Sequence, residues 1–274
     1  MEYFRLDGKT ALITGAAGRL GLQHCLALAD VGCDVILTDV DQLKLVTQKN
    51  LLEEKYPSRK FYSFVLDVRC EASVRNVQTE LENQHLNLDI LINNAAVNPQ
   101  VTTSGIVNTS RLENFRLDDW KMQIDVGLTG AFLCSKYFGF MISKNLHGGV
   151  IVNIASDLSV IAPDQRLYES EDLPNEKQNV KPISYSVVKT GLIGLTRYLS
   201  TYWSNAGVRC NALSPGGVEA EQPKEFIERV SKLIPAGRMA AKHEYHAALQ
   251  FLCCDASKYM TGQNLVIDGG RSVW

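Results

Sequence analysis

The sequence predicts an α/β fold: a single doubly wound domain in which a mostly parallel, seven-stranded sheet is flanked by helices on both faces. Short apolar runs alternate with longer amphipathic segments along the whole chain, which is typical of strand–helix–strand units. Polar residues recur where the apolar runs end, at the edge where open parallel sheets bind ligands. The 274 residues contain no repeat, low-complexity tract or linker-like stretch. One domain spanning residues 1–274 is therefore expected.

The first predicted unit is a strand, a glycine turn and a helix. The apolar run at 10–14 leads into TGAAGRLG at 14–21, and an amphipathic segment follows. Glycines let the backbone approach a pyrophosphate, and the helix N-terminus offers it N–H donors and a positive dipole. The turn therefore predicts a dinucleotide-binding site. Its glycines are Gly15, Gly18 and Gly21.

The second predicted strand, at 33–39, ends in Asp39, which lies 18 residues beyond Gly21. A carboxylate in this place can accept hydrogen bonds from the adenosine ribose and repel a 2′-phosphate, so it favours NAD over NADP. An alternative stays open, in which Asp39 only forms a turn and Asp41 caps the next helix. Arg19 adds a cation to the glycine turn and is expected to face the pyrophosphate or solvent.

Five further strands are predicted along the chain. Their ranges are 61–67, 88–96, 148–156, 207–214 and 263–268. Asp67, Asn94 and Ser156 stand at or near the ends of the first three of these strands. Pro215 and Gly216 follow the fourth. Because the carboxyl ends of parallel strands share one edge of a sheet, these residues are expected to surround one crevice.

The segment ISYSVVKTGLIGL, at 183–195, places Tyr185 and Lys189 four residues apart, which stacks a phenol and an ammonium on one helix face. A neighbouring cation favours the phenolate, so the pKa of Tyr185 is predicted to fall toward neutrality. Tyr185 is then a candidate acid/base. Taken alone, the pair could equally be a surface feature of a long helix.

Composition and charge indicate which partners, which location and which metal or disulfide chemistry to expect. Twenty-eight basic and 30 acidic residues give a net charge of −2 without a basic block, so nucleic acid is not expected as a partner. No uncharged run approaches the ~18 residues of a membrane span, and the first residues lack a signal-peptide core. A cytoplasmic protein is expected. Seven cysteines without a CxxC pair and five scattered histidines predict free thiols and no metal site.

Together these motifs resemble the short-chain dehydrogenase/reductase family along essentially the whole chain. The matching features are the glycine turn, Asp39, Asp67-Val68, NNAA at 93–96, Ser156, the Tyr185/Lys189 pair, NALSPGG at 211–217 and VIDGG at 266–270. Several weak motifs in a fixed order make a specific signal. The resemblance implies one Rossmann-fold domain, a nicotinamide dinucleotide cofactor, here NAD, and a homodimer or homotetramer.

The resemblance also implies roles for individual residues. Tyr185 would transfer a proton, Lys189 would hold the nicotinamide ribose and lower the pKa of the tyrosine, and Ser156 would hydrogen-bond the reacting oxygen. The implied cofactor-binding residues are Gly15, Gly18, Arg19, Leu20, Gly21, Asp39, Asp67, Val68, Asn94, Ala95, Tyr185, Lys189, Pro215, Gly216 and Val218.

Two departures from the family pattern matter. Gly127 stands where the family often has an asparagine, thought to prop a helix kink that holds a relay water; glycine tolerates a kink, but the relay is left open. Ser156 precedes Tyr185 by 29 residues, a longer connection than in short family members. The insertion at 158–183 is polar and contains three prolines, so it is either a substrate lid or a solvated loop.

Three cations of the insertion, Arg166, Lys177 and Lys181, are more simply explained as solvated loop charges than as partners of a phosphate or carboxylate. The glycine spacing and the long connection are similar to the extended branch of the family, whose members act on nucleotide sugars. A narrower resemblance is to shorter oxidoreductases of bacterial surface-glycan and sialic-acid-like, legionaminic-type sugar pathways.

We therefore predict an NAD(H)-dependent oxidoreductase that interconverts a secondary alcohol and a ketone on a carbohydrate-like substrate. One alternative is a sugar epimerase or dehydratase, in which the hydride returns to the same substrate. The other is a non-catalytic dinucleotide-binding module, suggested by Gly127 and by the absence of a threonine after the Pro-Gly pair at 215–216.

Overall fold

The computed structural model describes residues 2–97, 110–169 and 173–274. Within these ranges seven strands form one sheet, ordered β3-β2-β1-β4-β5-β6-β7, and every neighbouring pair is parallel. The strands are β1 Thr10–Thr14, β2 Asp34–Asp39, β3 Phe61–Val65, β4 Ile90–Asn93, β5 Gly149–Ile154, β6 Val208–Pro215 and β7 Asn264–Ile267. The predicted doubly wound α/β fold is confirmed. The strand order reverses between β1 and β4, which places a ligand-binding crevice at their carboxyl ends.

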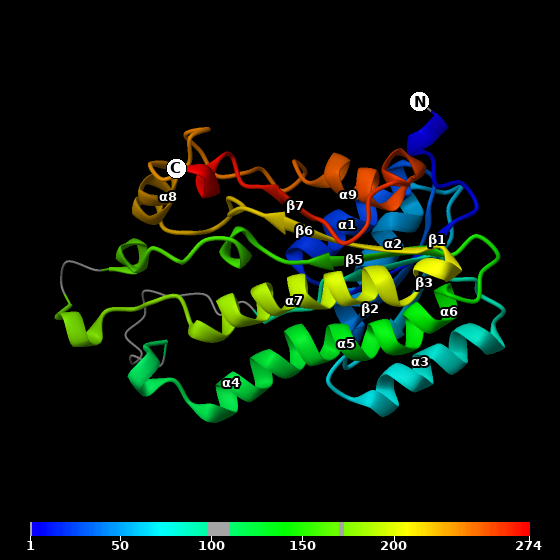
Figure 1. Cartoon of the computed structure of the whole chain (residues 1–274), viewed down its shortest axis with the longest axis horizontal. Coiled ribbons are helices and arrows are strands. Elements are labelled where there is room, and N and C mark those ends of the chain that lie inside the picture. The colour runs from blue at the N-terminus through cyan, green and yellow to red at the C-terminus, as the bar shows by residue number, and fades with distance from the viewer. Residues whose placement is uncertain (1, 98–109, 170–172) are drawn as a thin grey trace.

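Helices cover both faces of the sheet. They are α1 Arg19–Asp30, α2 Gln42–Lys55, α3 Glu71–Asn83, α4 Leu117–Ile124, α5 Gly130–Cys134, α6 Phe140–Ile142, α7 Ile183–Tyr202, α8 Lys224–Ser231 and α9 His246–Cys253. Figure 1 shows α1, α2 and α9 on one side of the sheet, and α3, α4 to α6 and α7 on the other. Two π-helical turns, Asp125–Thr129 and Ser135–Gly139, join α4, α5 and α6 into one continuous rod.

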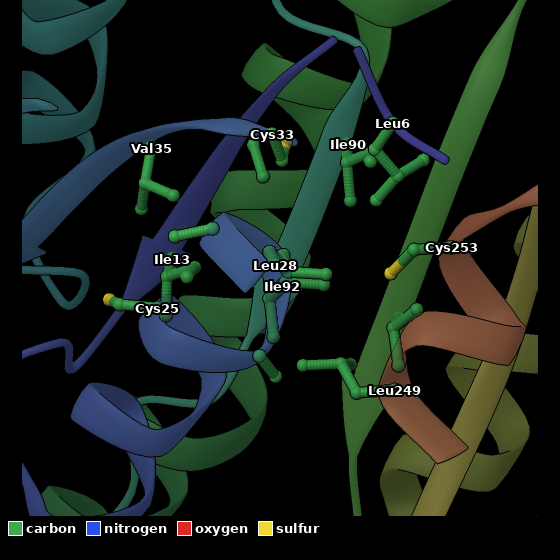
Figure 2. Close-up of a cluster of buried hydrophobic side chains, with 14 of the residues drawn as sticks. Leu6, Ile13, Cys25, Leu28, Cys33, Val35, Ile90, Ile92, Leu249 and Cys253 are labelled. Atoms are coloured by element: carbon green, nitrogen blue, oxygen red, sulfur yellow. The ribbon is translucent and has the colours of Figure 1, made fainter. Parts of the chain in front are cut away.

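Strands β1 to β6 each contribute side chains to two hydrophobic cores, and β7 contributes to one. In β1, Ile13 packs among side chains of α1, α2 and α9, the cluster of Figure 2, whereas its neighbour Leu12 packs on the opposite face. Because the sheet is buried on both faces, its strands are continuous apolar runs rather than alternating ones. Full burial of each such side chain stabilises the fold by roughly 1.5–3 kcal/mol, so the cores hold the strand ends rigidly in place.

The insertion at 158–183 leaves β5 and returns to α7 at the carboxyl edge of the sheet, beside α8 (Figure 1), with residues 170–172 outside the described ranges. The 3-10 turn Gln165–Tyr168 contains buried Leu167, which packs against Val230 and Ile234 in and after α8. The ring of Tyr168 lies 5.6 Å from that of Phe226. The insertion thus has an apolar anchor, which its polar composition did not suggest.

Among the described residues, no helix combines the length and apolar character that a bilayer crossing needs. The same ranges contain no group of three or more His, Cys, Asp or Glu side chains arranged to hold a metal ion. Six of the seven cysteines are buried, and all are free thiols. Burial raises the pKa of the Cys25, Cys134 and Cys253 thiols, which keeps them protonated and unreactive.

Candidate active site

The glycine turn between β1 and α1 is packed against main chain. A Cβ on Gly21 would lie 2.2 Å from the carbonyl oxygen of Gly15. Gly15 itself has a φ of +64°, and a Cβ there would lie 2.8 Å from the Cα of Ala95. Only glycine fits these two positions without a backbone shift.

The N-terminus of α1 suits an anion. Gly18 is the N-cap residue, and among the described residues no side chain caps this end of the helix. The first turn carries the exposed Arg19 and the half-buried Leu20 but no acidic residue. Its N–H groups and dipole therefore fit the pyrophosphate of a dinucleotide.

Asp39, at the end of β2, is held at the same turn. Its Oδ2 accepts a hydrogen bond from the Ala17 N–H at 3.0 Å, and its Oδ1 accepts one from the Asp41 N–H at 3.1 Å. Asp41 is also the N-cap of α2, because its carboxylate accepts from the Lys44 N–H. Both parts of the alternative left open by the sequence are present, because Asp39 forms a turn with Asp41 and Asp41 caps α2. Asp39 still presents a carboxylate with unused lone pairs beside the predicted dinucleotide site, so its ribose role stays a prediction.

Asn94 supports the glycine turn from β4. Its Nδ2 donates to the carbonyl oxygens of Thr14 and Gly15 at 2.9 and 3.1 Å. The backbone N–H groups of Asn94 and Ala95 both donate to Thr14 Oγ1 at 3.0 Å. The structure therefore uses the Asn94 amide to position the turn, which the sequence did not indicate.

Asp67 and Val68 follow β3 at the same edge. The Arg69 guanidinium, 2.8 Å from Asp67 Oδ2, lowers the pKa of that carboxyl through hydrogen bonds. The Val68 side chain is buried, and a Cβ on Gly130 would lie 2.7 Å from its Cγ2. The Val68 side chain therefore packs on the helical rod at Gly130, and its role in cofactor binding stays a prediction.

Pro215 ends β6, and the loop after it is fixed at two points. The Gly216 N–H donates to the Ile267 carbonyl at 2.8 Å, and the Gly216 carbonyl accepts from Tyr245 Oη at 3.0 Å. Val218 forms a parallel bridge with Ala240. This loop lies at the carboxyl edge, where the sequence predicts the nicotinamide end of the cofactor.

Ser156 lies just after β5, with 5% of its surface exposed. Its Oγ donates to Asp157 Oδ1 at 2.8 Å. The other carboxylate oxygen, Oδ2, accepts from the Arg271 guanidinium, also at 2.8 Å, in a buried ion pair. Sequence reasoning missed Asp157 and Arg271, because no spacing rule joins residues 114 positions apart.

Tyr185 and Lys189 share one face of α7, as predicted. The Lys189 ammonium is buried and donates to the Ile154 carbonyl at 2.7 Å, and its Nζ lies 5.7 Å from the Tyr185 ring centroid. Burial lowers the pKa of Lys189 to about 8, and the nearby Lys181 ammonium adds to this effect.

The prediction that the pKa of Tyr185 falls toward neutrality is wrong for this structure. Burial raises that pKa above its ordinary value, and the negative charge of Asp157 raises it further. A hydrogen bond with Ser156 acts in the opposite direction. Desolvation of the phenolate therefore outweighs the lysine that the helix spacing provides.

Lys181 was expected to be a solvated loop charge, and this is also wrong. Its Nζ lies 3.9 Å from the Tyr185 ring centroid, and burial lowers its pKa to about 8. Arg166, paired with Asp164, and Lys177 are exposed, as predicted. Lys181 precedes Tyr185 by four residues but lies before α7 begins at Ile183, so helix spacing could not have identified it.

A small cavity of about 10 Å³ opens beside Tyr185 and Lys189, lined also by Gln123, Gly127 and Val188. Gln123 is buried and accepts a hydrogen bond from Ser184 Oγ. A Cβ on Gly127 would lie 2.5 Å from Val188 Cγ1, so α7 packs directly on the π-helical turn. Gly127 is required for this packing, and its carbonyl-relay role stays a prediction.

Comparison with known proteins identifies the class. The short chain dehydrogenase family model matches residues 9–169, and a second model, for enoyl-(acyl carrier protein) reductase, matches residues 175–272. The chain therefore belongs to the short-chain dehydrogenase family, oxidoreductases that act on CH–OH groups.

Three relatives illustrate the similarity. D-threitol dehydrogenase of Mycolicibacterium smegmatis is 30% identical, with 98% of this chain and 95% of that protein aligned. A gluconate 5-dehydrogenase from Burkholderia cenocepacia, solved with NADP and tartrate, is 28% identical with a TM-score of 0.85, covering 99% of this chain and 98% of the other. A short chain dehydrogenase from Leptospira borgpetersenii with bound NAD+ is 29% identical, TM-score 0.83, covering 100% and 96%.

Proposed function

We propose that this enzyme is an NAD(H)-dependent oxidoreductase that interconverts a secondary alcohol and a ketone on a polar, carbohydrate-like substrate. The observation that carries the proposal is the meeting of Ser156, Tyr185 and Lys189 at the carboxyl edge, on the same edge as the glycine turn. A proton-transfer group and a dinucleotide cradle at one edge suit hydride transfer coupled to proton transfer.

Each residue of the trio has a distinct task in this proposal. Tyr185 gives or takes the proton of the substrate oxygen, and Lys189 binds the nicotinamide ribose. Ser156 hydrogen-bonds the reacting oxygen, for which its hydroxyl turns away from Asp157, its acceptor at 2.8 Å. A bound nicotinamide ring supplies or accepts the hydride.

The preference for NAD over NADP is proposed from Asp39, whose carboxylate is fixed beside the glycine turn. Fluorescence titration with NADH and NADPH tests it. Asp39→Ala should shift the preference toward NADPH, because the repulsion of a 2′-phosphate is removed. Asp41→Ala is the matched control, since losing the α2 cap costs about 1 kcal/mol of stability and leaves cofactor choice unchanged. Tighter NADPH than NADH binding by the unaltered enzyme contradicts the proposal.

The substrate class is proposed from the relatives, whose names include a tetritol and a sugar-acid dehydrogenase. Within it, a narrower candidate is a sialic-acid-like sugar of the legionaminic type. A turnover screen with NAD and a panel of polyols, aldonates, sugar phosphates and nonulosonates tests both. Net formation of NADH identifies an oxidoreductase. Isomerised or dehydrated product without NADH identifies an epimerase or dehydratase, and cofactor binding without any product identifies a non-catalytic binder.

A homodimer or homotetramer is proposed from the outer faces of α5 to α7. Phe132, Phe140, Tyr198 and Tyr202 are each between 47% and 61% exposed. Large apolar side chains gathered on neighbouring helices mark interaction surfaces. Light scattering measures the molecular mass in solution, and a monomer at micromolar concentration contradicts the proposal.

A further inference from the structure

We propose that Lys181, carried by the insertion, is a second cation that acts on Tyr185 and favours the ionised tyrosine during proton transfer. This inference rests on the proposed function, in which Tyr185 exchanges a proton with the substrate. It assigns the insertion a part in the chemical step, beyond covering the substrate.

Two ammonium groups lie near the Tyr185 ring. Lys181 Nζ lies 3.9 Å from the ring centroid, and Lys189 Nζ lies 5.7 Å from it. A cation this close is attracted to the electron-rich ring face. Ionisation adds negative charge to the ring and its oxygen, so the attraction is stronger for the phenolate than for the phenol. Lys181 therefore lowers the cost of ionising a tyrosine that burial keeps protonated.

Lys181 is held in place by the insertion and not by α7. Its backbone N–H donates to Gln165 Oε1 at 2.8 Å, and Gln165 begins the turn that buries Leu167 against the α8 region. Pro182 follows it and restricts its backbone to an extended conformation. Folding of the insertion thus determines where this ammonium lies relative to the ring.

Other charged and titratable groups face this pair. Asp157 opposes ionisation of Tyr185 and favours the charged form of Lys181, while the Arg271 guanidinium balances Asp157 from 2.8 Å. Tyr168 lies near Tyr185 and stays neutral, because burial raises its pKa to about 12. Lys181 and Lys189 place two positive charges beside the Tyr185 ring, opposite in sign to the charge of Asp157.

The sign of the pH dependence follows from Lys181. Burial lowers its pKa to about 8, so it carries its charge below that pH and loses it above. Its effect on Tyr185 is therefore present at neutral pH and fades as the pH rises past 8. Since the two groups interact, their titrations are coupled, and the phenolate in turn favours the charged lysine.

The first experiment measures kcat/KM for alcohol oxidation against pH. Oxidation needs the phenolate, so activity rises with pH through an apparent pKa. Lys181→Met should raise the apparent pKa of this activity profile by about one pH unit, which lowers kcat/KM about tenfold at pH 7. At pH 10 kcat/KM should be near the parent value, because Lys181 of the parent is then uncharged. Lys181→Arg should restore the parent value of kcat/KM at pH 7 and, because arginine keeps its charge, should also retain the effect above pH 8, where the parent loses it. Lys177→Met, at an exposed lysine of the same insertion, is the matched control and should change nothing.

The second experiment requires no substrate, so its failure is distinct from failure of the proposed function. Tyrosinate absorbance is titrated with NAD present, and the Tyr185 signal is isolated from the 10 tyrosines by subtracting Tyr185→Phe. Lys181→Met should raise the apparent pKa of that signal. An unchanged titration and an unchanged activity profile overturn the proposal. So does a higher KM for acidic substrates alone, which makes Lys181 a substrate ligand instead.

Discussion

The proposed cofactor side and the proposed substrate side of the candidate active site are built differently. On the cofactor side, Asp39 and Asn94 hold the main chain of the glycine turn, at Ala17, Thr14 and Gly15. On the substrate side, the important contacts join side chains from distant segments: Asp157 after β5, Lys181 in the insertion and Arg271 near the end of the chain.

This difference has a physical consequence. A main-chain cradle tolerates few changes, because a single Cβ on Gly21 would collide with backbone 2.2 Å away. Contacts between side chains change with each substitution while the fold persists, and they can adapt to different substrates. The cofactor side is therefore recognisable as a local sequence motif, whereas the substrate side joins residues far apart in the sequence and forms no such motif.

The largest effect is expected at the point where the two sides meet. Tyr185→Phe removes the proton donor and keeps the ring, so activity should fall at least ~10²-fold while NADH affinity stays near that of the parent. Steady-state kinetics and fluorescence titration measure the two quantities. Tyr168→Phe, at a half-buried tyrosine of the insertion, is the control and should retain activity. Equal rates for the Tyr185→Phe variant and the parent enzyme would remove Tyr185 from the mechanism.

A second prediction tests whether the insertion affects substrate turnover without affecting cofactor binding. Replacing residues 164–177 with a glycine-serine bridge removes Gln165 and Leu167, which position Lys181 and pack on the α8 region. Activity on the best substrate should fall roughly 10-fold or more, since lids orient substrate and exclude water. NADH affinity should stay within a few-fold, because the cofactor cradle is untouched. If the shortened enzyme kept the parent's rate and substrate range, the insertion would be a solvated loop with no part in catalysis.

A third prediction concerns the cofactor side alone. Gly21→Ala forces a methyl group onto the Gly15 carbonyl and the Ala16 Cα, 2.2 and 2.7 Å away. Overpacking of this kind costs about 1–3 kcal/mol, so the variant should unfold at lower denaturant concentration and lose NADH affinity. If Gly21→Ala kept the parent's stability and NADH affinity, the backbone of the turn would have to shift at little cost to make room for the methyl group.

The smallest effect is expected at Gly194, which serves as the matched control for Gly21. It lies inside α7, and a Cβ added there would have no described atom of another element within 4 Å. Gly194→Ala should therefore stabilise the protein by about 0.5–1 kcal/mol through helix propensity. Urea unfolding of the two variants compares them directly. A destabilised Gly194→Ala variant would place Gly194 within the proposed oligomer interface, because Tyr198 lies one turn further along the same helix face.

The sequence alone determined the fold class and the seven strands, and it predicted Ser156, Tyr185 and Lys189 as the catalytic residues. These features depend on local patterns: apolar periodicity, glycines in a turn and a four-residue spacing on one helix. It also indicated Asp41 as a cap, because capping involves residues three apart.

Tertiary structure alone decided the electrostatics. The helix spacing of Tyr185 and Lys189 predicted a lowered tyrosine pKa, but burial reversed the direction, and burial depends on every element packed around the ring. The ion pair of Asp157 with Arg271 joins residues 114 positions apart, and Lys181 reaches Tyr185 because of where the insertion folds. Charges act through space and through the local dielectric, and neither quantity is encoded in the spacing of residues along the chain.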